Sequence, residues 1–173
     1  MIRKAGLLLI LSVLGRMLSA EDLPPELVKQ YEGRWVGEFT VYSSASDYSE
    51  TFIVEQQYWY KDGILRGVSV SQRESGISSS RSETKIVEGK LISEVSHSDG
   101  QTEQFIGTRH EGGIVWIPAD MQRATDYQIK ETFKEEAGDT VMQTEGFDSY
   151  VYADGLAQLV YKGHLVKSGT EAD

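Results

Sequence analysis

The sequence predicts an all-β fold, an antiparallel up-and-down barrel of about ten strands preceded by a short N-terminal helix. Three observations predict it. Apolar and polar residues alternate with period two over most of the chain, and glycine-containing turn signals separate the alternating runs. No long helical pattern lies between these runs, which argues against parallel βαβ units.

In two strands, the face that is otherwise apolar carries single polar residues. These faces comprise Val54, Gln56, Tyr58 and Tyr60 in one strand, and Tyr127, Ile129, Glu131 and Phe133 in the other. Alternate residues of a strand point to the same face, so each set shares one side of its strand. We expect these faces to line the interior of the barrel.

Turn signals divide the alternating region into strands. Asp62-Gly63, Asp99-Gly100 and Asp154-Gly155 are strong hairpin signals, because the favoured two-residue turns need positive φ angles. With weaker glycine turns they predict strands within 34–167, at 34–44, 50–61, 64–72, 80–88, 90–98, 102–110, 113–118, 125–135, 140–150 and 156–167. A meander of this length must close or split into two sheets, because open edges invite aggregation, and we expect closure.

The segments outside the strands are predicted separately. Prolines at the start of residues 24–32 suit a first helical turn, and Leu27, Val28 and Tyr31 fall on one helical face. A short helix over 24–32 is therefore expected. The serine-rich stretch 71–82 is expected to be a mobile loop and 169–173 a disordered tail.

The first twenty residues resemble a secretory signal peptide. A basic start at Arg3 and Lys4 precedes an apolar stretch over 5–15, and small residues lie before a cleavage site after Ala20. The apolar stretch is too short to span a bilayer. We therefore expect an exported protein, periplasmic or extracellular, in which 21–168 form a single domain.

The amino-acid composition excludes several kinds of site and disfavours several kinds of partner. The chain has no Cys and no Asn, which excludes disulfides, thiolate metal sites, a cysteine nucleophile and N-glycosylation. Of the 17 basic residues, three lie in the signal segment, which leaves 14 against 27 acidic residues and a net charge of −13. Such a surface disfavours nucleic acids and anionic membranes as partners. An exported chain of this composition is typical of bacteria.

The start of the first strand carries a short motif, Gly33-Arg34-Trp35-Val36-Gly37-Glu38. It resembles the Gly-x-Trp start of the calycin barrels, which include lipocalins, fatty-acid-binding proteins and nitrobindin-like proteins. It is most similar to nitrobindin-like proteins and to exported lipocalin-like domains of bacteria. The resemblance implies that Trp35 plugs the closed end of the barrel beneath the helix, that glycine permits close approach there, and that the interior binds a ligand.

Two further positions bear on the resemblance. Lipocalins pack a late arginine over the tryptophan, whereas the last strand here offers Lys162 and Lys167, which stack less well. Nitrobindin-like proteins place a haem-ligating histidine in a His-Leu context, which His164 matches, so the resemblance implies haem as an alternative cofactor. Regular alternation puts His164 on the face opposite Leu165, and a bulge at Gly163 would be needed to reverse it.

No catalytic signature is present in the sequence. The three histidines lack metal-ligand spacing, and nothing resembles a nucleophile elbow, a phosphate-binding loop or a triad. We expect His97 at the barrel rim and His110 exposed beside a turn. A Glu131–Glu145 carboxylate pair is the one enzymatic alternative. The prediction is a protein without catalysis, cofactor or metal.

Polar residues on otherwise apolar faces are the candidate ligand-binding residues: Arg66, Gln56, Tyr58, Tyr127, Glu131 and Gln143. Buried charge is costly unless it is paired. Arg66 would therefore either pair with Glu131 or meet an anionic group of the ligand bidentately.

The predicted function is binding of a small amphipathic or hydrophobic molecule in the barrel interior. The alternative is a barrel filled by its own side chains, such as Trp59, Tyr58 and Tyr127, which acts as an interaction module of the envelope. A haem-binding barrel with His164 as ligand is the third possibility.

Overall fold

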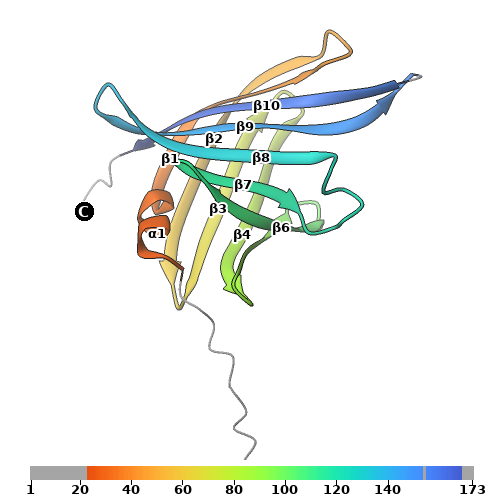
Figure 1. The fold of residues 1–173 in the computed structure, drawn as a ribbon. Helices are drawn as coiled ribbons and strands as arrows, with labels where there is room; N and C mark the ends of the chain where they lie inside the picture. Colours follow the sequence, from red (N-terminus) through yellow and green to blue (C-terminus); the bar gives the residue numbers. More distant parts are fainter. Residues whose placement is uncertain (1–22, 154, 169–173) are drawn as a thin grey trace, which may run out of the picture.

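The computed structural model describes residues 23–153 and 155–168, which form a closed ten-stranded antiparallel barrel with one helix at an end (Figure 1). The barrel and its short N-terminal helix confirm the predicted fold class. The predicted signal segment 1–20 and the predicted tail 169–173 lie outside the described residues.

The elements follow one another as a meander. The helix α1 spans Pro25–Tyr31, and the strands are β1 (Gly33–Ser43), β2 (Ser49–Lys61), β3 (Ile64–Arg73), β4 (Gly76–Val87), β5 (Lys90–His97), β6 (Thr102–His110), β7 (Gly113–Pro118), β8 (Tyr127–Glu136), β9 (Asp139–Tyr152) and β10 (Gly155–Ser168). Each strand pairs with its neighbour in sequence, and β1 pairs with β10 to close the ring. Closure removes both free edges of the sheet.

One expected loop is instead part of the sheet. The serine-rich stretch 71–82 continues β3 to Arg73 and starts β4 at Gly76, with only a tight turn between them. Ser71 and Ser78 face each other across the two strands, and their Oγ atoms lie 2.7 Å apart in a hydrogen bond. Serine side chains that bond across a strand pair support the sheet, so the prediction of a mobile loop is wrong.

Helix α1 closes one end of the barrel. Its apolar face buries Leu27, Val28 and Tyr31, as the sequence predicts. Trp35 at the start of β1 is fully buried, and its Nε1 donates a 2.7 Å hydrogen bond to the carbonyl oxygen of Tyr31. The expected tryptophan plug beneath the helix is therefore confirmed. In the described part of the chain, no helix is long and apolar enough to cross a membrane.

Lys167 covers the ring of Trp35, at the place where the lipocalin resemblance implies an arginine. Lys167 pairs with Trp35 across β1 and β10, and its Nζ lies 5.2 Å from the centre of the indole ring. The same amine donates a hydrogen bond to the backbone oxygen of Lys29 in α1. Partial burial lowers the pKa of Lys167. Gly33 enters β1 at a φ of 123°, a conformation that favours glycine.

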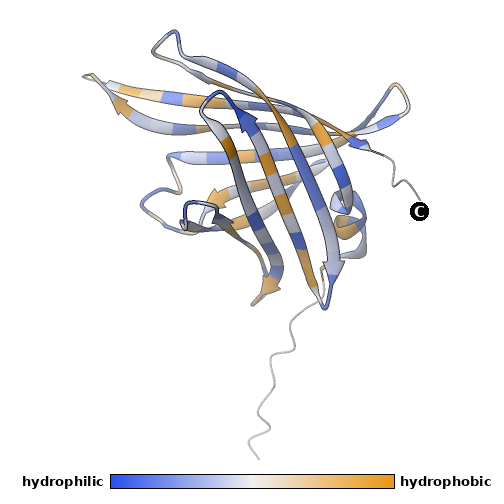
Figure 2. Ribbon diagram, turned by 180° about the vertical axis from the view of Figure 1, so that it is seen from behind, coloured by the Kyte–Doolittle hydropathy of each residue, from blue (hydrophilic) through white to orange (hydrophobic). Residues whose placement is uncertain are grey.

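Inward-facing and outward-facing residues alternate along the strands, which gives the banded pattern of hydropathy in Figure 2. The interior is filled unevenly. Beneath β1, β8, β9 and β10, the core contains the fully buried side chains of Trp35, Met142 and Leu165, with Phe133 packed against this core. The remaining interior, beneath α1 and β2 to β8, contains a cavity.

The end of the barrel opposite α1 carries ion pairs. Arg73 binds Glu50, and Arg123 lies 3.1 Å from both Glu103 and Asp148. The guanidinium of Arg73 is the main cause that lowers the pKa of Glu50 to about 2. We call this end the mouth of the barrel.

Gly37 is one of the barrel-wall glycines that leave no room for a side chain. A Cβ added there would lie 2.0 Å from the backbone oxygen of His164 and 2.7 Å from Cα of Leu165 in β10. Because backbone cannot move aside cheaply, we expect Gly37→Ala to cost about 3 kcal/mol of unfolding free energy. Urea denaturation followed by tryptophan fluorescence measures this cost.

Gly155→Ala provides the matched control, because a Cβ there meets nothing within 4 Å. Its unfolding midpoint should stay near that of the wild type. Equal midpoints for the two variants would show that β1 and β10 are not in close contact at Gly37.

Candidate ligand-binding site

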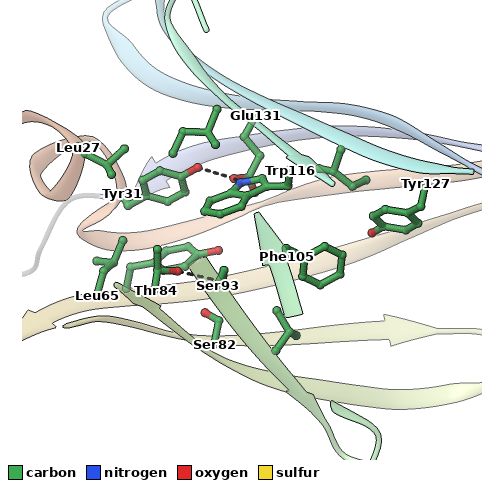
Figure 3. A pocket seen from close by; sticks show the side chains of 14 residues that line it. Leu27, Tyr31, Leu65, Ser82, Thr84, Ser93, Phe105, Trp116, Tyr127 and Glu131 are labelled. Carbon is green, nitrogen blue, oxygen red and sulfur yellow. Dashed lines mark hydrogen bonds between the residues drawn. The ribbon is translucent and has the colours of Figure 1, made fainter. Parts of the chain in front are cut away.

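The cavity holds about 150 Å³ and lies between helix α1 and strands β2 to β8 (Figure 3). Leu27 and Tyr31 of α1 line it at one side and Tyr127 of β8 at the other. Its walls are mainly aromatic and aliphatic, with a few hydroxyl groups and one carboxyl group: Tyr58, Leu65, Ser82, Thr84, Ser93, Val95, Phe105, Ile114, Trp116, Ile129 and Glu131. An apolar enclosure with few polar groups is the usual composition of a small-molecule site.

Glu131 is the acidic group of this cavity. Its Oε2 accepts hydrogen bonds from the hydroxyl of Tyr31 and from Nε1 of Trp116, the latter at 2.8 Å. No hydrogen bond from the described residues reaches its other oxygen, Oε1. The side chain keeps some accessible surface because it lines the cavity. Glu131 therefore offers one oxygen to whatever occupies the cavity.

Tyr31 is fixed in position by packing as well as by hydrogen bonding. Its ring makes edge contacts with Tyr58 and Phe133, with ring centres 5.4 Å and 4.8 Å away. Its backbone oxygen accepts the hydrogen bond from Trp35. The hydroxyl group that meets Glu131 is therefore preorganised by the same contacts that seal the barrel end.

Burial sets the protonation behaviour of the site. Removal from water raises the pKa of Glu131, while the hydrogen bonds from Tyr31 and Trp116 oppose the increase. Burial likewise raises the pKa of Tyr58 and Tyr127. None of the residues that line the cavity is Lys, Arg or His, so no cation of the described chain compensates Glu131 there.

Hydroxyl groups form a second polar wall. Thr84 donates a 3.0 Å hydrogen bond to Ser93, and both lie on the inward faces of neighbouring strands. Ser82 and Tyr127 also line the cavity. These groups can accept or donate hydrogen bonds to a bound molecule.

Four of the six predicted site residues belong to inward-facing rows. Tyr58, Tyr127 and Glu131 line the cavity. Gln56 lies two residues from Tyr58 on the same face of β2, and its Oε1 accepts a 3.4 Å hydrogen bond from the hydroxyl of Tyr58. The expected inward faces of β2 and β8 are confirmed.

Arg66 lies on the outer surface, contrary to expectation. Its Nε is 3.2 Å from Glu83, and its Nη1 donates a 2.9 Å hydrogen bond to the backbone oxygen of Lys61. Leu65, its neighbour, takes the inward position and is buried. The predicted pairing of Arg66 with Glu131 is therefore wrong, and Arg66 does not line the cavity.

Gln143 and His164 also face outward, on neighbouring strands β9 and β10. Gln143 pairs with His164 in register, and both side chains bind Glu136, His164 Nε2 at 2.9 Å. The pairing of β10 with β1 and β9 is regular through Gly163, so the bulge that would turn His164 inward is not formed. This position does not place His164 in the interior, where a haem would be enclosed.

Two other proposed interior groups lie outside. Trp59 is 38% exposed and pairs with Arg66, so it does not fill the barrel. Glu145 is exposed and pairs with Lys130 on the outer face, so Glu131 and Glu145 are not brought together. Among residues 23–153 and 155–168, no three His, Asp or Glu side chains gather in a way that could hold a metal ion.

Sequence reasoning missed Tyr31 and Trp116 as site residues. Tyr31 was expected on the buried face of the helix, but a helix pattern does not show what lies beneath it. Trp116 lies between Ile114 and Pro118 on one face of β7, and all three are buried. The alternation of β7 could have predicted that Trp116 points into the barrel. Its contact with Glu131 could not be predicted in this way, because it depends on the pairing of β7 with β8.

The fold and the cavity define a class: a closed antiparallel barrel, sealed at one end by a helix over a buried tryptophan and containing an interior pocket. This architecture is compatible with a calycin-like barrel. No protein-family model matches the chain, and no curated protein matches it in sequence. The calycin resemblance therefore depends on the Gly33–Gly37 motif and on the barrel itself.

Replacing Glu131 by Gln should change how stability depends on pH. The folded state raises the pKa of Glu131 above its ordinary value of 4.5, so the native protein retains the proton longer than the unfolded chain does. The stability that the retained proton gives the wild-type protein is lost as the pH rises from 4.5 through the folded-state pKa of Glu131. We expect Glu131→Gln to gain stability relative to the wild type over that range in urea titrations.

Glu145→Gln is the control, since Glu145 is exposed on the neighbouring strand. The difference between Glu145→Gln and the wild type should not vary with pH in this way. A stability difference for Glu131→Gln that stays constant between pH 4 and pH 8 would contradict a raised pKa.

Proposed function

We propose that this protein is an exported carrier that binds one small, partly apolar molecule in the barrel interior. The observation that carries the proposal is the cavity of about 150 Å³, which is lined by aromatic side chains and by Glu131, one of whose carboxyl oxygens has no donor among the described residues. Export is supported by the signal-like residues 1–20. No cofactor or catalytic group is included in the proposal.

The size of the cavity limits the ligand. An apolar cavity of about 150 Å³ in another protein holds a benzene molecule. The natural ligand should therefore be no larger than a small ring or a short branched chain, unless the structure opens on binding. A long fatty-acid chain would extend beyond the described cavity.

Filling the cavity should abolish binding without unfolding the barrel. Val95 lines the cavity from β5 and makes no polar contact that the change would break. We expect Val95→Phe to weaken the binding of benzyl alcohol and toluene by about tenfold or more, because the added ring occupies the space. Titration followed by ligand-observed NMR measures the affinity.

Glu94→Phe introduces the same ring on the opposite face of β5, where residue 94 is exposed. It should leave the binding of both probes unchanged. If neither probe binds the wild-type protein, or if Val95→Phe binds both as the wild type does, the cavity is not the binding site.

The mouth supports a second candidate function, an interaction module. Large apolar side chains are exposed at three of its connections: Ile77 at 76%, Met121 at 81%, and Val151 and Leu156 at 79% and 82%. The turns at the helix end carry polar residues and glycine instead, such as Asp62-Gly63 and Glu88-Gly89. Apolar groups gathered at one end of a protein are typical of contact with another molecule.

A photocrosslinking amino acid at Leu156 tests this candidate in the exporting host. We expect it to give one discrete protein adduct, because Leu156 would lie within the contact. The same group at Val87, which is exposed at the helix end, should give none. Identical adducts from both positions, or no adduct from Leu156, would argue against an interaction module.

A further inference from the structure

The lining of the cavity contains a carboxyl group and no cationic side chain, and this bears on the charge of the ligand. Arg66, which the sequence suggested as a binder of anions, lies outside, and the cavity is lined by Glu131 with no Lys, Arg or His. The arginines at the mouth are already paired with carboxylates. An anionic ligand would find no counter-ion in the cavity and would be repelled by ionised Glu131.

The two oxygens of Glu131 are not equivalent. Both protein donors, Tyr31 and Trp116, bind Oε2. A carboxylate can accept about four hydrogen bonds, so Oε1 retains its accepting capacity, and Glu131 lines the cavity. A ligand that donates a hydrogen bond and carries a positive charge would satisfy Oε1 and compensate the buried charge together.

The aromatic walls favour the same kind of ligand. Tyr31, Tyr58, Phe105, Trp116 and Tyr127 surround the cavity on several sides. The faces of aromatic rings carry partial negative charge and attract cations, most strongly when water is excluded. The net charge of −10 also attracts cations to the protein from solution.

We propose that the cavity binds a small organic cation, a primary amine on a ring-sized or short apolar body, whose ammonium group donates to Oε1 of Glu131. This inference rests on the proposed function and specifies its ligand class. The apolar body occupies the space beside Val95 and Phe105.

Benzylamine, benzyl alcohol and toluene form a probe series of nearly equal size that differs mainly in the terminal group. Calorimetric titration of the wild-type protein at pH 7.5 should show benzylamine binding about tenfold or more tightly than benzyl alcohol. Glu131→Gln keeps an oxygen for Tyr31 and Trp116 but removes the charge. It should weaken benzylamine by about tenfold while changing benzyl alcohol by less than about threefold.

Glu145→Gln distinguishes an effect of the cavity carboxyl group from an effect of the protein's surface charge. It removes an exposed carboxylate from the next strand. It should leave benzylamine affinity unchanged. Equal loss with Glu145→Gln and Glu131→Gln would overturn the inference, since the amine would then respond only to surface charge. If Glu131→Gln does not fold, loss of benzylamine binding in Val95→Phe supports the site and its retention overturns it.

The outcomes distinguish the two proposals. Benzyl alcohol or toluene binding as tightly as benzylamine would overturn the amine inference and leave the carrier function standing. Absence of binding by all three probes would overturn both. Preferential binding of benzylamine that depends on Glu131 and is blocked by Val95→Phe supports both.

Discussion

Tyr31 holds the closed end of the barrel and its interior site together. Its carbonyl accepts the hydrogen bond of Trp35, its ring packs on Tyr58 and Phe133, and its hydroxyl binds Glu131. One residue of a short helix thus contacts β1, β2 and β8. A helix of seven residues would not be stable alone, so its position depends on these contacts.

The same residue explains why a carboxyl group can lie inside the barrel. An unpaired buried carboxylate is costly, yet both groups that bind Glu131 are neutral donors on large rings. They satisfy one oxygen and leave the other open. Arg66, Arg73 and Arg123, by contrast, lie on the outer surface or at the mouth, each beside a carboxylate. Within the described residues, the lining around this acid contains no Lys, Arg or His.

Alternation and turn signals predicted the number and order of the strands, and alternation predicted the inward direction of Gln56, Tyr58, Tyr127 and Glu131. Closure was predicted because open sheet edges invite aggregation. Alternation failed at Arg66 for a physical reason. In β3 both faces carry apolar residues, Leu65 inside and Val68 outside, so a period of two exists without showing which face is buried. Which face of β3 points into the barrel is decided only by its register with β2 and β4.

The serine-rich stretch shows a related limit. Its composition is that of a loop, but cross-strand pairing gives a partner to every residue outside the turn at Glu74 and Ser75, and pairing is a property of two segments rather than one. Trp116 and Tyr31 reach Glu131 from strands and a helix far apart in sequence, at separations of 15 and 100 residues. The sequence of each segment alone does not contain such contacts.

The interior is filled unevenly, so the residues that maintain the fold differ from those that shape the pocket. Many small proteins must meet both requirements with the same residues. Trp35, Met142 and Leu165 hold the tightly packed half, whereas Ser82, Ser93 and Val95 line the half that has room. Substitutions in the second group can alter the size and shape of the pocket while the packed half maintains the fold. Ligand preference in this barrel can therefore diverge between related chains by exchange of a few wall residues on β4 and β5, with the sealing helix and its tryptophan retained.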